Sequence, residues 1–128
     1  MSDLYRENIL EHYKNPQNYG SLENPDASIT DTNPLCGDRL TLEINCDDRS
    51  ILTDIAFTAK GCALSVASAS LLCENVKGKC LKDIENFDYN YMQELLEIKV
   101  GVGRAKCVLL PLGALHKAIK KIEKNEHA

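Results

Sequence analysis

Three cysteines carry the strongest chemical signal in this sequence. Cys36 lies in the segment Asn-Pro-Leu-Cys-Gly-Asp at 33–38, Cys62 follows Lys-Gly, and Cys107 ends the segment Arg-Ala-Lys-Cys at 104–107. Thiolates bind zinc and iron–sulfur clusters, and they are also strong nucleophiles. Three that converge would form a metal site, a sulfur-handling site, or both. Because the chain has no Cys-x-x-Cys pair, the tertiary fold must assemble any shared site.

Two of these cysteines fall where a helix is expected to begin. Unpaired backbone N–H groups and the helix dipole at such a position favour the thiolate form of Cys62 and Cys107. Lys60 precedes Cys62 by two residues, and Arg104 and Lys106 precede Cys107 closely. We expect these three cations to give electrostatic support to the thiolates.

The other cysteines and the histidines have simpler interpretations. A lone cysteine most often acts as a small buried hydrophobe, and we expect this of Cys46, Cys73 and Cys80. Imidazole is another common metal ligand. However, His12 and His116 lie on expected helices away from the three cysteine segments, and His127 is close to the end of the chain. We therefore expect packed or solvated histidines.

The elements that must position the cysteines follow from the residue pattern. The sequence predicts helices at 3–14, 62–76, 80–84 and 89–96, an irregular segment at 17–25, and strands at 27–33, 39–45 and 52–59. Proline is tolerated in the first turn of a helix, so Pro111 places the start of the last helix at or just before Val108, with its end near Lys124. The fold class is α+β, with a three-stranded antiparallel sheet and helices packed on one face.

Composition excludes several classes of protein. The chain has 128 residues, which suits one domain over 1–128, and its net charge of −4 and lack of tryptophan argue against a nucleic-acid partner. No apolar run approaches the roughly 18 residues of a membrane span, and the first residues lack a secretory signal. We expect a protein of the reducing cytoplasm, where clustered cysteines indicate metal or redox chemistry rather than disulfides.

The sequence around the cysteines resembles the scaffold family of iron–sulfur cluster assembly, which comprises IscU, SufU and the N-terminal domain of NifU. The similar segments are 33–38, the Gly-Cys followed by small residues at 61–70, Arg-x-Lys-Cys at 104–107, and His-Tyr-Lys-Asn-Pro-Gln-Asn at 12–18. Gln17 stands where the family usually has arginine. The resemblance runs from about Leu4 to Ile122 and implies a single SufE/NifU-like domain.

The resemblance implies a metal site made of Cys36, Asp38, Cys62 and Cys107. Three thiolates and one carboxylate satisfy tetrahedral zinc, and they equally satisfy a [2Fe–2S] cluster with one non-thiolate ligand. A carboxylate is a more exchangeable ligand for iron than a fourth thiolate, which suits a protein that gives its cluster away. The alternative is that Asp38 only begins a turn or a strand.

The chain departs from the family in two places. IscU-type members have histidine before the third cysteine, whereas this chain has Lys106, a poor metal ligand at neutral pH. The Arg-Ala-Lys-Cys segment is closer to the SufU pattern, yet the insertion that SufU proteins carry before it is missing. The chaperone-recognition segment of IscU would fall at 100–104 and does not match, so docking of an Hsp70-type chaperone is in doubt.

The resemblance implies a scaffold without independent turnover. It would accept sulfur as persulfide from a cysteine desulfurase, with Cys36 and Cys107 as candidate acceptors, build a [2Fe–2S] cluster and transfer it to apo iron–sulfur proteins. The alternative is a SufU-like zinc-dependent sulfurtransferase that uses the same four residues. A thiol redox protein is a third reading, which the missing Cys-x-x-Cys disfavours. We expect a monomer or weak homo-oligomer.

Overall fold

The computed structural model describes residues 3–34, 37–97 and 100–126 of the chain. The order of elements is α1 (Asp3–Lys14), β1 (Ala27–Asn33), β2 (Asp38–Cys46), β3 (Leu52–Lys60), α2 (Ala63–Val76), α3 (Leu81–Glu85), α4 (Tyr89–Leu96), the 3₁₀ turn η1 (Val102–Arg104) and α5 (Ala105–Glu126). The strands form one antiparallel sheet in the order β1-β2-β3. The predicted α+β class and the predicted elements are confirmed, except for the start of the last helix.

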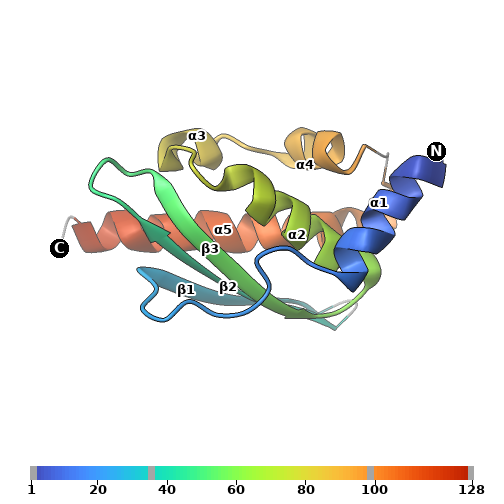
Figure 1. Ribbon diagram of the computed structural model, residues 1–128, viewed down its shortest axis with the longest axis horizontal. Helices are drawn as coiled ribbons and strands as arrows, with labels where there is room; N and C mark the ends of the chain where they lie inside the picture. Colours follow the sequence, from blue (N-terminus) through green and yellow to red (C-terminus); the bar gives the residue numbers. More distant parts are fainter. Residues whose placement is uncertain (1–2, 35–36, 98–99, 127–128) are drawn as a thin grey trace.

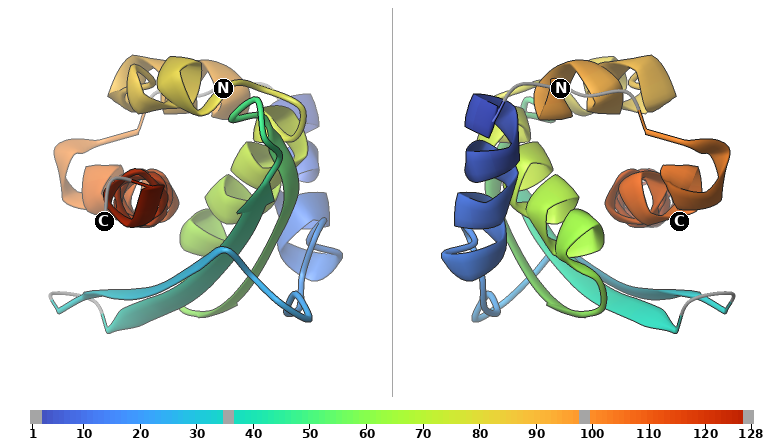
Figure 2. Two further views of the ribbon diagram at one scale, coloured as in Figure 1. Left: turned by 90° about the vertical axis from the view of Figure 1, so that its left-hand side faces the viewer. Right: turned by 90° about the vertical axis from the view of Figure 1, so that its right-hand side faces the viewer.

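One face of the sheet carries the core. Leu40, Leu42 and Ile44 alternate along β2, are at most 1% exposed, and pair across the sheet with residues of β3. This period of two puts their side chains on one face, which α2 and α5 cover (Figures 1 and 2). Helix α1 packs against α2, and α4 packs against both α2 and α5. The layers bring the ends of β2, β3 and α5 to one end of the domain.

Helix α2 is buried along most of its length because its residues are small. Ten consecutive residues from Leu64 to Cys73 are buried, and three of them are serines. Short side chains let the helix lie close to the sheet on one side and to α1 and α5 on others. The helix predicted over 62–76 is confirmed.

The start of α5 corrects the sequence-based expectation. The helix begins at Ala105, so Pro111 is its seventh residue and not part of the first turn. A proline there cannot donate a backbone hydrogen bond to the carbonyl four residues earlier, at a cost of about 3 kcal/mol. The early turns bury Cys107 as well as Val108 and Leu110, and a fully buried Val or Leu side chain contributes about 1.5–3 kcal/mol. Burial outweighs the local preference, and the helix therefore reaches back past Cys107.

Two cationic side chains lie opposite each other on the outer face of the sheet. Arg39 of β2 pairs directly with Lys60 of β3, and both are exposed. They line a shallow pocket with Tyr19, Thr41 and Thr58. Like charges that face each other across a strand pair are destabilising. The pair is therefore a local cost to the stability of the sheet.

We expect Lys60→Gln to raise the free energy of unfolding by about 0.2–1 kcal/mol at low salt, because it removes this repulsion. The gain should shrink as salt screens the charges. Urea unfolding at two ionic strengths measures both effects. Lys79→Gln, an exposed lysine outside the strands, is the control, and an Lys60→Gln protein less stable than the parent at low salt would contradict the interpretation.

Candidate metal centre

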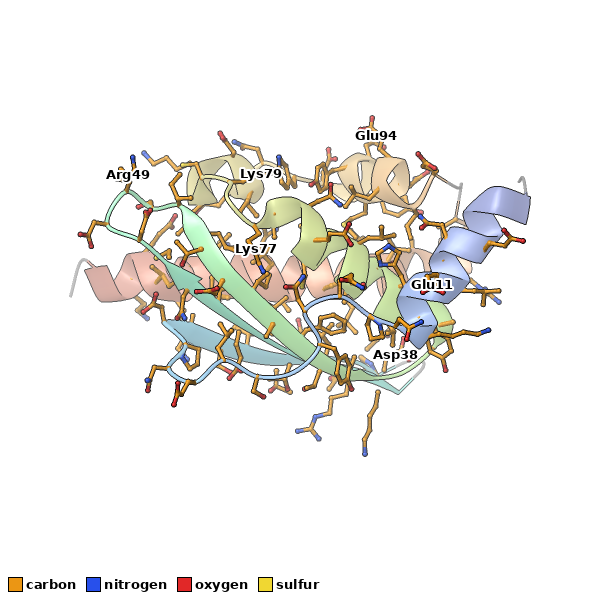
Figure 3. All side chains as sticks on the ribbon, viewed as in Figure 1. Glu11, Asp38, Arg49, Lys77, Lys79 and Glu94 are labelled. Carbon is orange, nitrogen blue, oxygen red and sulfur yellow. The ribbon has the colours of Figure 1, made fainter. Side chains whose placement is uncertain are left out.

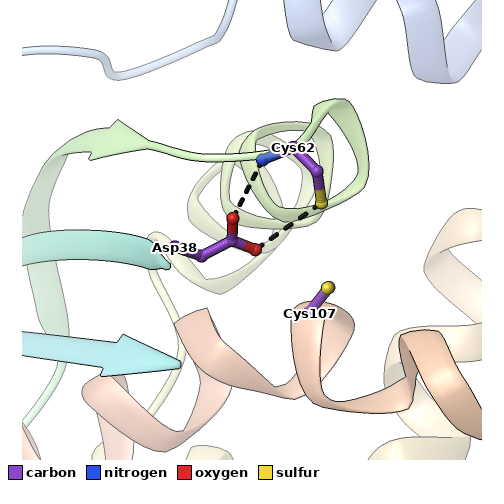
Figure 4. Close-up of side chains that lie close together, drawn as sticks. All are labelled: Asp38, Cys62 and Cys107. Carbon is purple, nitrogen blue, oxygen red and sulfur yellow. Dashed lines mark hydrogen bonds between the residues drawn. The ribbon is translucent and has the colours of Figure 1, made fainter. Parts of the chain in front are cut away.

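Asp38, Cys62 and Cys107 meet at one end of the domain. Their ligand atoms, one carboxylate oxygen and two sulfurs, all lie within 4.8 Å of one another. Asp38 is the first residue of β2, Cys62 is the N-cap of α2, and Cys107 lies in the first turn of α5. Figure 4 shows the three side chains pointing toward a common centre. The predicted convergence of distant segments is confirmed for these three residues.

Cys36, the fourth member of the predicted site, lies outside the described residues. The residues on either side of its segment form the connection between β1 and β2. The Gly37 N–H donates to the carbonyl of Asn33 over 2.8 Å, and Gly37 has a φ of 75°, a conformation that glycine adopts readily. Asn33 and Asp38 are partners in the sheet register. The role of Cys36 stays a prediction.

The carboxylate of Asp38 is buried and held at both oxygens. It is 3% exposed. Oδ1 accepts the backbone N–H of Cys62 over 3.1 Å, and Oδ2 accepts the hydroxyl of Ser65 and lies 3.6 Å from Cys62 Sγ. The Cys62 N–H belongs to the N-terminus of α2, where the helix dipole favours a negative charge. The structure thus places Asp38 among the sulfurs and not in a solvated turn.

Gly61 makes this placement of Asp38 possible. A Cβ at this position would lie 2.7 Å from Asp38 Cγ and 3.0 Å from Asp38 Cβ. Real Cβ contacts are longer than this, so any side chain at 61 would displace the carboxylate. In the sequence Gly61 is only the neighbour of Cys62, and the need for glycine follows from its contact with Asp38, a residue 23 positions earlier in the chain.

Burial differs among the three candidate ligands. Asp38 and Cys107 are buried, at 3% and 6% exposure, whereas Cys62 is exposed. A metal at this site would therefore be held from within by the sheet and α5 and would be reachable past Cys62. That access suits a site whose contents enter and leave through contact with another protein.

Of the three cations predicted to support the thiolates, Lys60 lies on the face of the sheet away from the site. Lys60 lies on the outer face of the sheet with Arg39, because the register puts Asp38 and the Cβ direction of Gly61 on the inner face. Arg104 and Lys106 are exposed and precede Cys107 at the start of α5. Whether these cations favour the thiolates stays a prediction.

The remaining described cysteines lie apart from this centre. Cys73 is fully buried in α2, and Cys80 lines a hollow of about 790 Å³ together with Arg49 and residues of α3 and α5. Figure 3 shows Arg49 and Asp38 at opposite ends of the domain. Cys46 is half-buried at the end of β2. The interpretation of Cys73 as a buried hydrophobe is confirmed.

The described histidines are packed and not ligands of the centre. His12 Nδ1 lies 2.7 Å from Ser70 Oγ, and the backbone N–H of Gln17 donates to the same oxygen over 2.7 Å. His116 Nε2 lies 3.0 Å from the carbonyl of Ile84. His127 lies outside the described residues. His12 and its neighbours therefore fasten α1 and the following segment to α2.

Ser65 is a site residue that sequence reasoning missed. In the sequence it is only one of the small residues that follow Gly-Cys at 61–70. The structure shows it 1% exposed, bonded to Asp38 and 3.4 Å from Cys62 Sγ. The available signal was its spacing, since residues three apart on a helix share a face, so a serine three after Cys62 faces the same ligands.

Comparison with known proteins shows the family of this chain. The family model for the NifU-like N-terminal domain matches residues 4–128. The chain belongs to this family. IscU of Escherichia coli, an iron–sulfur cluster assembly scaffold protein, is 35% identical over 97% of this chain and 98% of its own. SufU of Bacillus subtilis, a zinc-dependent sulfurtransferase, is 33% identical over 96% of this chain and 94% of its own.

Solved structures of the family share the fold. The NifU-like N-terminal protein of Brucella abortus has a TM-score of 0.81 at 27% identity and covers 95% of this chain and 96% of its own. SufU of Fervidobacterium islandicum has a TM-score of 0.73 at 29% identity and covers 93% of this chain and 99% of its own. Among the described residues, no helix is long and apolar enough to cross a membrane.

We expect Gly61→Ala to lower the free energy of unfolding by about 1–3 kcal/mol, because the new methyl group displaces the Asp38 carboxylate in a packed site. Metal affinity should fall with it. Thermal unfolding and zinc titration measure the two effects. Gly101→Ala is the matched control, because a Cβ there meets nothing within 4 Å, and equal behaviour of the two variants would contradict the steric argument.

Cys73 should resist alkylation while Cys62 reacts. Burial raises the pKa of the Cys73 thiol to about 12, so it remains protonated, and inert as a nucleophile, well above neutral pH. We expect iodoacetamide to modify Cys62 in the native protein at pH 8 and to reach Cys73 only after unfolding. Peptide mass spectrometry of the alkylated protein gives the result, and modification of native Cys73 at pH 8 would contradict it.

The raised pKa of Cys73 also predicts how stability depends on pH. Because the pKa of this thiol is higher in the folded than in the unfolded protein, its ionisation should lower the free energy of unfolding only as the pH rises from about 9 to 12.

Proposed function

We propose that this chain is a scaffold for iron–sulfur cluster assembly, with Cys36, Asp38, Cys62 and Cys107 as the ligands of a [2Fe–2S] cluster. The observation that carries the proposal is the convergence of Asp38, Cys62 and Cys107 at one accessible end of the domain. Thiolates are the common protein ligands of such clusters, and the carboxylate supplies a more exchangeable fourth position. The cluster is cargo, and the family relationship to IscU supports this role.

The chain's own residues bind and orient the cargo. Cys107 and Asp38 hold it from the buried side, and Cys62 faces the surface.

A cysteine desulfurase would deliver sulfur as persulfide to Cys36 or Cys107. In this step the thiolate attacks the terminal sulfur of the donor persulfide, and the donor thiolate leaves. Iron and the electrons that reduce the terminal sulfur to sulfide must come from an iron source and an external reductant. The proposed acceptors of the assembled cluster are apo iron–sulfur proteins in the cytoplasm.

A zinc-dependent sulfurtransferase is the second candidate, and Lys106 is the observation that favours it. This lysine replaces the histidine of IscU-type proteins and matches the SufU pattern, and SufU of Bacillus subtilis is nearly as similar to this chain as the IscU proteins are. The donor set of thiolates and one carboxylate fits tetrahedral zinc equally well. In this mechanism zinc would hold the thiolates in their deprotonated form, and Cys36 would leave the metal to take up sulfur.

Metal content decides between the two functions. The protein is purified without oxygen, incubated with a cysteine desulfurase, cysteine, ferrous iron and a thiol reductant, and analysed for iron, acid-labile sulfide and zinc. We expect iron and sulfide in equal amounts, with a visible charge-transfer absorption. Tightly held zinc with no sulfide, together with persulfide on a cysteine, would establish the sulfurtransferase.

Cysteine variants test the ligand set in the same experiment. Cys36→Ser, Cys62→Ser and Cys107→Ser should each abolish or sharply weaken cluster formation, because each removes a thiolate ligand. Cys80→Ser is the matched control, since Cys80 lies at the other end of the domain, and it should load normally. Normal loading of the Cys107→Ser protein would rule out the proposed ligand set.

A further inference from the structure

The hydroxyl of Ser65 contacts two of the three described ligands. Ser65 lies in the first turn of α2 and is 1% exposed. Its Oγ donates a hydrogen bond to Asp38 Oδ2 and lies 3.4 Å from Cys62 Sγ. A buried hydroxyl is costly unless it is hydrogen-bonded. Its bond to a buried carboxylate indicates a specific role at the site.

Together with the backbone, Ser65 determines the orientation of the carboxylate. The Cys62 N–H occupies Oδ1 over 3.1 Å, and the Ser65 hydroxyl binds Oδ2. Oδ2 is also the oxygen that lies 3.6 Å from Cys62 Sγ. A carboxylate with both oxygens fixed cannot rotate about its Cβ–Cγ bond. Its Oδ2 therefore faces the sulfurs before any metal arrives.

We propose that Ser65 is a positioning residue that sets metal affinity through Asp38. Carboxylates that ligate a metal are themselves hydrogen-bonded, and removal of such a partner typically costs about 10–100-fold in affinity. Oδ2 has lone pairs for both the Ser65 hydroxyl and a metal ion. Without the hydroxyl, Asp38 would lose rotational freedom at the moment of binding, which weakens binding. The inference rests on the proposed metal site, and it holds for zinc and for an iron–sulfur cluster alike.

The same helix supplies a matched control. Ser68 lies one turn further along α2 and is 0% exposed, and its hydroxyl has no hydrogen-bond partner within the described part of the chain. Ser68→Ala therefore removes a buried serine hydroxyl from the same element without touching Asp38. Any general effect of alanine on α2 will show in both variants.

The first measurement is the affinity for Zn²⁺ and Co²⁺ by competition with a chromogenic chelator. We expect Ser65→Ala to weaken both by about 10–100-fold and Ser68→Ala to change neither by more than about twofold. Ser65→Thr keeps the hydroxyl and should recover most of the affinity. Circular dichroism checks that each variant is folded. Parental affinity in a folded Ser65→Ala protein would overturn the proposal.

A double-mutant cycle shows whether Ser65 acts through Asp38. If it does, Ser65→Ala should cost nothing further in an Asp38→Ala background, because no carboxylate remains to be positioned. The ligand-field absorption of bound Co²⁺ should also shift in Ser65→Ala toward that of Asp38→Ala. Additive losses of affinity, or a parental Co²⁺ spectrum in Ser65→Ala, would overturn the positioning role.

The outcomes for the two proposals are distinguishable. The titrations with Zn²⁺ and Co²⁺ contain no desulfurase and no acceptor, so the cycle does not depend on cluster assembly. Tight binding of Co²⁺ by the wild-type protein, with the expected double-mutant cycle among its variants, would support the role of Ser65. If the same wild-type protein assembled no cluster and carried no persulfide, the proposed function would be overturned.

Discussion

The buried carboxylate of Asp38 is the constraint on which the organisation of the site depends. Moving an ionised carboxyl group out of water is costly unless hydrogen bonds or charges compensate. Here the compensation comes from the first turn of α2, through the Cys62 N–H and the Ser65 hydroxyl. The same two bonds tie the beginning of β2 to the beginning of α2. Hydrogen bonding of one buried carboxyl group thus ties the sheet to the helix at the end where the thiols lie.

The candidate site lies at one end of a hydrophobic core. The inner face of the sheet packs Leu40, Leu42 and Ile44 beneath α2 and α5, and these side chains are almost fully excluded from solvent. Close-packed interiors of this kind resist deformation. Asp38, Cys62 and Cys107, the candidate ligands, each lie at the end of a regular element that packs into that interior. Ligands on rigid elements are held more accurately than ligands on loops, which explains how segments 69 residues apart along the chain can share one centre.

The chain combines features of two branches of its family. Its identity to IscU of Escherichia coli and to SufU of Bacillus subtilis differs by only two percentage points, so overall similarity does not separate a cluster scaffold from a zinc-dependent sulfurtransferase. The chemical difference lies beside the third cysteine, where Lys106 cannot act as an imidazole ligand. In the proposed ligand set the fourth position accordingly falls to Asp38. The structure offers both proposed functions a buried carboxylate and an exposed thiol.

The sequence by itself determined the α+β class, the bounds of the strands to within one residue, and the segments that carry the chemistry. These properties are local: alternation of apolar residues, glycine and proline at boundaries, and cysteines in recognisable segments. Only the tertiary structure decided that Asp38 is buried among the sulfurs, that Gly61 must lack a side chain to admit it, and that Ser65 donates a hydrogen bond to it. It also decided that Lys60 faces away from the site and that α5 begins six residues before Pro111. These properties depend on contacts between segments distant along the chain, where burial and strand register outweigh the preferences of neighbouring residues.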